Sequence, residues 1–149
     1  MRPLSASAPL AADVSLLVLR LVVGGVMVAH GAQKLFDQGL DATIGGFAGM
    51  GVPLPEITAP FVVGVELIGG ALVVLGAALP IVGILVAIDM LVAAVLVHAP
   101  FGVFVGDGGW ELVAALGAGA LALAVVGGGR FGVGGALAGR SRSRRRGAA

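Results

Sequence analysis

Residues 57–97 form an apolar stretch that carries only two charged side chains, Glu66 and Asp89. As an α-helix this stretch would be about 61 Å long, at a rise of about 1.5 Å per residue. That length is about twice the hydrocarbon thickness of a bilayer, which is about 30 Å. The stretch therefore predicts two membrane-spanning helices. Pro80 lies near its midpoint, and residues 76–80 predict a tight turn that starts the second helix.

A single kinked span over residues 67–88 is the alternative for this stretch. It would place Glu66 and Asp89 at the two membrane interfaces. It would also leave the apolar residues 61–63 and 90–97 in water, which is unfavourable. The sequence therefore favours two spans over one.

Two further apolar segments extend the prediction to an all-α, integral membrane bundle of four transmembrane helices over residues 14–129. The composition agrees, because 58% of the residues are hydrophobic and only 11% are charged, against about 25% charged in soluble domains. A soluble domain and a nucleic-acid-binding body are thereby excluded. A cleaved signal peptide is the alternative for the first segment, but Arg20 interrupts the apolar run and the run continues too far. The predicted spans are residues 14–36, 57–78, 80–98 and 110–127.

Lysine and arginine placement predicts the orientation of the bundle. Five arginines lie among the last ten residues, so the basic tail, 130–149, is expected in the cytoplasm. An even number of spans then places residues 1–13 in the cytoplasm too. The tail is also expected to attract anionic membrane lipid. The segments expected outside carry acidic residues, namely Asp37, Asp41, Glu56 and Asp107.

Three ionisable residues, Arg20, Glu66 and Asp89, fall inside the predicted spans. Counted from the span ends, they lie about 9–14 Å deep, which would let the arginine reach both carboxyl groups. Intramembrane ionisable residues are costly and are usually functional or paired. The sequence predicts a catalytic cluster of these three residues that handles protons or charge. A clamp that fixes the helix register is the structural alternative.

A second polar layer is predicted near the outer face. His30 and Lys34 share one helix face, His98 ends the third span and Glu111 begins the fourth. These four residues predict either a pocket for a quinone or an anionic headgroup, or ordinary interfacial side chains. The chain has no cysteine and no metal-binding motif, so no metal site is expected. No cofactor is required, and a bound quinone is the candidate ligand.

Several short patterns together resemble the DoxX family of small four-helix membrane proteins. The resemblance covers roughly residues 14–132. It implies a location in the bacterial cytoplasmic (plasma) membrane. For some members it implies the small subunit of a thiosulfate:quinone oxidoreductase, or a membrane complex with soluble redox-defence enzymes. The patterns are Arg20, His30-Gly31-x-x-Lys34-Leu35-Phe36, Phe47-x-x-Met50-Gly51-Val52-Pro53-x-Pro55, Glu66-x-x-Gly69-Gly70, His98 and Gly108-Gly109-Trp110-Glu111.

The expected function is a quinone-linked subunit or membrane anchor of an oxidoreductase or oxidative-stress complex. The expected partners are membrane lipid, soluble redox enzymes and a second copy of the chain, but not nucleic acid. One alternative is a non-enzymatic scaffold that recruits soluble partners. Another is a small-solute transporter, which would need a homodimer because four short spans leave little room for alternating access.

Overall fold

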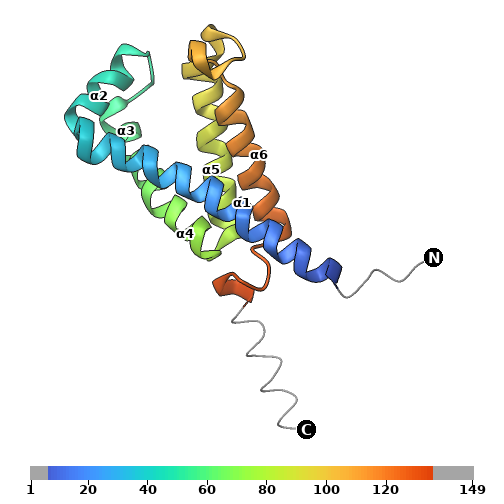
Figure 1. Cartoon of the computed structure of the whole chain (residues 1–149). Helices are drawn as coiled ribbons and strands as arrows, with labels where there is room; N and C mark the ends of the chain where they lie inside the picture. Colours follow the sequence, from blue (N-terminus) through green and yellow to red (C-terminus); the bar gives the residue numbers. More distant parts are fainter. Residues whose placement is uncertain (1–6, 136–149) are drawn as a thin grey trace.

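The computed structural model describes residues 7–135, which form helices and turns without a strand (Figure 1). The all-α prediction is therefore confirmed for this part of the chain. Residues 1–6 of the predicted cytoplasmic N-terminus and residues 136–149 of the predicted basic tail lie outside the described residues.

Three helical rods are long and apolar enough to cross a bilayer, and a fourth apolar helix, α6 (Glu111–Val126), is shorter. Helix α2 (Leu40–Gly49) and the 3₁₀ turn η5 (Val105–Asp107) lie in the connections between them. The first rod comprises α1 (Ser7–Ala32) and the π-helical segment η1 (Gln33–Gln38). The second comprises α3 (Pro55–Gly64), the π-helical η2 (Val65–Gly69) and α4 (Gly70–Leu75). The third comprises α5 (Leu79–Ala93), the π-helical η3 (Ala94–His98) and the 3₁₀ turn η4 (Ala99–Phe101).

The turn between the second and third rods has the predicted form. Gly76 ends α4 in the left-handed conformation with φ of 68°, which glycine adopts without steric cost. Ala78 precedes α5 with φ of 50°, and Pro80 occupies the first turn of that helix. This proline needs no amide hydrogen there, because the first turn of a helix has no intrahelical acceptor for it.

Glycines bring the backbones of α1 and the second rod into direct contact. A Cβ atom on Gly24 would lie 2.6 Å from the carbonyl oxygen of Gly70, and one on Gly31 would lie 2.8 Å from the amide nitrogen of Leu67. Such close approach is typical of small residues in membrane bundles. It sets an antiparallel register in which Gly31 lies beside Glu66.

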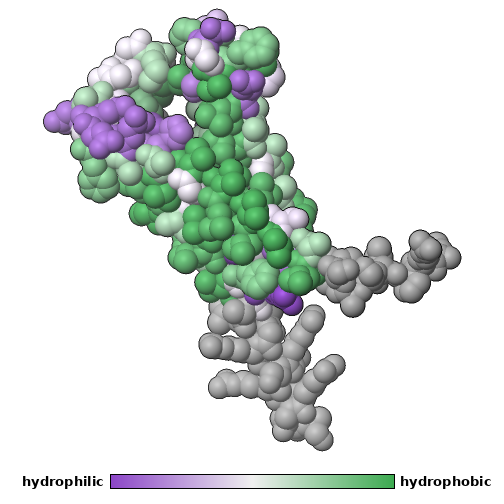
Figure 2. Space-filling view, viewed as in Figure 1, coloured by the Kyte–Doolittle hydropathy of each residue, from purple (hydrophilic) through white to green (hydrophobic). Residues whose placement is uncertain are grey.

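The remaining helices complete the bundle around one buried core. Helix α5 packs along α6, where Gly83 lies against Ala120, and α1 packs along α4. In Figure 1, α1 runs obliquely across α5 and α6, and α2 and α3 lie near the end of the rod that α1 begins. Much of the outer surface is apolar (Figure 2), as expected for helices that face lipid. The most buried core side chains include Met27, Val73, Val86 and Leu123.

Replacing Gly24 by alanine is expected to destabilise the bundle, because the added methyl group would overlap the Gly70 carbonyl oxygen and Val74. The free energy of unfolding should fall by about 1–3 kcal/mol, as in other overpacked cores. Gly25→Ala is the matched control, since a Cβ atom at Gly25 meets nothing within 4 Å. That variant should be as stable as the parent or more stable, because alanine favours helix over glycine by about 1 kcal/mol. Unfolding of both variants in mild detergent, followed by circular dichroism, tests this contrast; equal stabilities would contradict the proposed contact.

Candidate functional site

A cavity of about 600 Å³ lies at the end of the bundle where the rods diverge into two lobes (Figure 2). Its volume falls within the range of about 300–1,000 Å³ that is usual for small-molecule sites. Most of its lining is apolar and comes from α3, α5 and α6, together with Phe47 of α2. Five ionisable side chains also line it: His30, Lys34, Glu66, Asp89 and His98.

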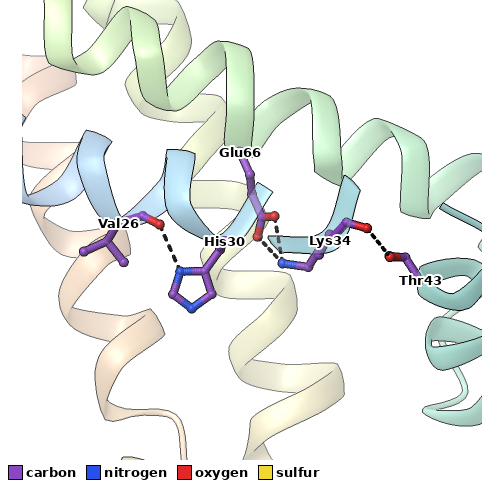
Figure 3. A network of polar contacts seen from close by, with 5 residues as sticks. All are labelled: Val26, His30, Lys34, Thr43 and Glu66. Carbon is purple, nitrogen blue, oxygen red and sulfur yellow. Dashed lines mark hydrogen bonds and ion pairs between the residues drawn. The ribbon is translucent and has the colours of Figure 1, made fainter. Parts of the chain in front are cut away.

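Lys34 and Glu66 form an ion pair in the cavity wall (Figure 3). The Lys34 Nζ atom donates to both carboxylate oxygens of Glu66, at 2.7 Å each. The Glu66 side chain is only 4% exposed, so its charge would be costly to bury without the cation. Two charge-assisted hydrogen bonds therefore hold η1 against η2.

Three of the cavity residues occupy the π-helical segments of the three long rods. Lys34 lies in η1, Glu66 in η2 and His98 in η3. A π-helical turn inserts an extra residue, and such turns occur frequently at functional sites. In η1 the Thr43 hydroxyl donates to the Lys34 carbonyl oxygen at 3.0 Å, which anchors α2 to this segment (Figure 3).

Asp89 of α5 also lines the cavity and has only 9% of its surface exposed. Its Oδ2 atom is buried and has no hydrogen-bond partner within residues 7–135. Buried polar atoms are nearly always hydrogen-bonded, so the unpartnered oxygen makes the Asp89 carboxyl group an unusual feature of the cavity wall. The site thus combines two carboxyl groups with one ammonium group.

Both histidine rings are held by backbone carbonyl oxygens. The Nδ1 atom of His30 lies 2.9 Å from the Val26 oxygen, one turn earlier in α1 (Figure 3). The Nδ1 atom of His98 lies 2.6 Å from the Gly108 oxygen. A carbonyl oxygen only accepts hydrogen bonds, so Nδ1 is the donor in both rings. The second contact also ties the end of the third rod to the segment before α6.

The predicted charge cluster of Arg20 with Glu66 and Asp89 is wrong, because Arg20 does not line the cavity. The arginine is 1% exposed, and its Nη2 atom donates to the Phe131 carbonyl oxygen at 3.3 Å. Its guanidinium group packs against Gly76, Gly128 and Gly132. Along α1, Arg20 lies about 16 Å from Gly31, the residue beside Glu66. Arg20 therefore holds the segment after α6 against the turn between α4 and α5, and Lys34 supplies the cation for Glu66.

Glu111 is also absent from the cavity lining, in contrast to the prediction. Its Oε1 atom accepts a hydrogen bond from the Val105 amide at 2.7 Å. A carboxylate at the start of α6 is favoured there by the helix dipole. Glu111 thus stabilises the turn before α6. Five of the seven predicted residues line one cavity, and Arg20 and Glu111 make structural contacts elsewhere instead.

Sequence reasoning did not identify the apolar residues that enclose the cavity. Phe47 lies in helix α2 and Met50 directly follows it, in the segment between the first two predicted spans. Phe61 and Leu96 combine partial exposure with a position in the cavity wall. The sequence pattern alone does not distinguish these apolar side chains from side chains that face lipid. The aromatic and methionine residues at 47 and 50 were the one available signal.

The DoxX family model matches residues 15–99, which is more than half of the chain. The chain belongs to the DoxX family. The matched region contains all five ionisable residues of the cavity, and Glu111 lies outside it. Arg20, which lies away from the cavity, falls within the DoxX match, whereas Glu111 does not.

This DoxX protein is similar to a protein of Bacillus subtilis (strain 168) named "Putative oxidoreductase CatD". The two are 38% identical over 91 residues, which cover 60% of this chain and 65% of the relative. The chain thus spans less than two thirds of the relative's length. No solved structure matches the chain. In residues 7–135, no group of three or more His, Cys, Asp or Glu side chains is arranged to hold a metal ion.

Substituting Lys34 by methionine is expected to lower the free energy of unfolding by about 3–5 kcal/mol, because it leaves the Glu66 carboxylate buried without its cation. The double variant Lys34→Met/Glu66→Gln should lose much less than the sum of the two single losses, since it removes both charges. A double-mutant cycle of unfolding in detergent measures this coupling. Additive losses would show that the ion pair does not hold the two rods together.

Proposed function

We propose that this DoxX protein is a quinone-linked subunit of a membrane oxidoreductase complex, and that the cavity between η1, η2 and α5 binds the quinone headgroup. The observation that carries the proposal is the Lys34–Glu66 pair beside the unpartnered Oδ2 atom of Asp89 in a largely apolar cavity. The name of the Bacillus relative, which includes the word oxidoreductase, agrees with this class of activity.

The residues present are suited to such a ligand. A quinone has a flat apolar ring with polar atoms at opposite ends, and the cavity has apolar walls with polar groups on different rods. Phe61 of α3 and Leu96 of η3 line the cavity and are also more than 40% exposed. In a membrane that exposure would be to lipid, so a hydrophobic tail would leave the cavity between apolar side chains.

The chain itself supplies binding groups and groups that exchange protons. A quinone accepts two electrons and two protons when it is reduced to the quinol. Lys34 and Glu66 are suited to orienting the polar end of the ring, and Asp89 is suited to exchanging a proton with it. The chain has no cysteine, so the electrons would come from a partner subunit that carries a redox cofactor, such as a soluble dehydrogenase.

We also propose that the protein lies in the bacterial plasma membrane with both termini in the cytoplasm. Asp13 of α1 contacts Arg130 after α6, with its Oδ1 atom accepting from the Arg130 amide at 2.9 Å. The beginning of α1 and the chain after α6 are therefore at one end of the bundle (Figure 1). The opposite end carries α2 and η5, where Asp41 and Asp107 lie and described lysine and arginine residues are scarce.

Binding of a short-tailed quinone, decyl-ubiquinone, should quench the fluorescence of Trp110, the single tryptophan of the chain. Its neighbours Gly109 and Leu112 line the cavity. Asp89→Asn and Glu66→Gln should each weaken the binding about tenfold, which is about 1.4 kcal/mol and typical of a lost hydrogen bond to a charged group. Titration of the protein in lipid nanodiscs measures these affinities.

Glu111→Gln is the matched control for this titration, because Glu111 is acidic but does not line the cavity, and glutamine can still accept from the Val105 amide. It should bind decyl-ubiquinone as the parent does. The proposed function would be overturned if Asp89→Asn and Glu66→Gln bound decyl-ubiquinone as tightly as the parent. It would also be overturned if the parent showed no quenching.

A fluorescent protein fused after residue 149 is expected to mature and fluoresce in bacterial cells, since it folds only in the cytoplasm. Alkaline phosphatase fused at the same place should be inactive, because it needs the oxidising outer compartment. Active phosphatase fusions at the C-terminus would reverse the proposed orientation.

A further inference from the structure

The two histidines of the cavity present the same kind of hydrogen-bonding atom to a ligand. Nδ1 donates to a backbone carbonyl oxygen in both His30 and His98. When both imidazole rings are neutral, only one nitrogen of each carries hydrogen, so Nε2 is an acceptor in both. Within residues 7–135 neither Nε2 atom has a hydrogen-bond partner, and both histidines line the cavity.

The Lys34–Glu66 pair adds few free donors to the cavity. Glu66 already receives two hydrogen bonds from Lys34. An ammonium group has three N–H bonds, so at most one donor of Lys34 is left for a ligand. The cavity is therefore rich in acceptors and poor in donors.

We propose that the cavity binds the reduced, dihydroxy form of its ligand more tightly than the oxidised, dicarbonyl form. The inference rests on the proposed function and adds the redox state that the site prefers. The two hydroxyl groups of a quinol donate, and they would match the Nε2 atoms of His30 and His98. The oxygens of a quinone only accept, so they would face other acceptors and leave polar atoms unpaired, which strongly disfavours a ligand.

Such a preference changes the reduction potential of the bound couple. A site that binds the quinol more tightly than the quinone favours reduction, and it raises the potential of the bound couple relative to the free one. Each tenfold difference in affinity corresponds to about 30 mV for a two-electron couple. The bound quinone would therefore oxidise an electron donor more readily than the free quinone does.

The inference is tested by calorimetric titration of the full chain in lipid nanodiscs with three probes under anaerobic conditions. The probes are decyl-ubiquinone, decyl-ubiquinol and the dimethyl ether of that quinol, and empty nanodiscs provide the blank. The quinol is expected to bind at least tenfold more tightly than the quinone. The ether has the shape of the quinol but no O–H group, so it should bind no more tightly than the quinone.

Asparagine and glutamine variants distinguish the contributions of the two ring nitrogens of each histidine. The amide nitrogen of asparagine is as many bonds from Cβ as Nδ1, so His98→Asn can still donate to the Gly108 oxygen but lacks the acceptor at the Nε2 position. The amide oxygen of glutamine is as many bonds from Cβ as Nε2, so His98→Gln keeps an acceptor there. The quinol-to-quinone affinity ratio should fall threefold or more in His98→Asn and in His30→Asn, and less in the glutamine variants. Ser15→Ala, which removes a hydroxyl bonded only within α1, should keep the parental ratio.

The outcomes distinguish this inference from the proposed function. If quinone binds as tightly as quinol, or more tightly, the cavity is a quinone site without the proposed preference. If the preference persists in both asparagine variants while they remain folded, the histidine nitrogens do not cause it. If none of the three probes binds, the proposed function fails and the inference fails with it.

Discussion

The direct backbone contact between α1 and the second rod determines which side chains meet in the rest of the bundle. Gly24 and Gly70 allow the two helices to touch, and this contact places Gly31 beside Glu66 and Lys34 within reach of its carboxylate. A slip of one helical turn, about 5.4 Å, would separate the ammonium group from the carboxylate and leave Glu66 buried with its charge uncompensated. Shape and charge thus specify the same register, and the cavity depends on both.

Hydropathy was sufficient to predict the all-α membrane bundle, because a membrane span is a property of one continuous segment. The turn before α5 was predictable for the same reason, since Gly76 and Pro80 act through their own backbone geometry. The site depends on contacts between segments. Arg20 was assigned to the intramembrane cluster from a depth counted along one helix, whereas the glycine contacts place it beside Gly76. Lys34 was assigned to the outer layer, yet it pairs with Glu66, so the two predicted layers meet in one cavity.

The π-helical segments and α2 could not be predicted from local preference. A π-helical turn is not favoured by any residue type, and it forms where neighbouring contacts compensate the altered hydrogen bonds, as Thr43 does for Lys34. Helix α2 contains Gly45, Gly46 and Gly49, each of which disfavours helix. Its position therefore depends on packing against η1 and α3. These tertiary effects bring Phe47 into the cavity wall.

The cavity and the ion pair between Asp13 and Arg130 lie at opposite ends of the bundle. In the proposed orientation, the cavity would exchange protons with the outer side of the membrane. A cytoplasmic partner would meet the end that carries Asp13 and Arg130. The surface available to such a partner and the ligand cavity are therefore separated by the depth of the bundle.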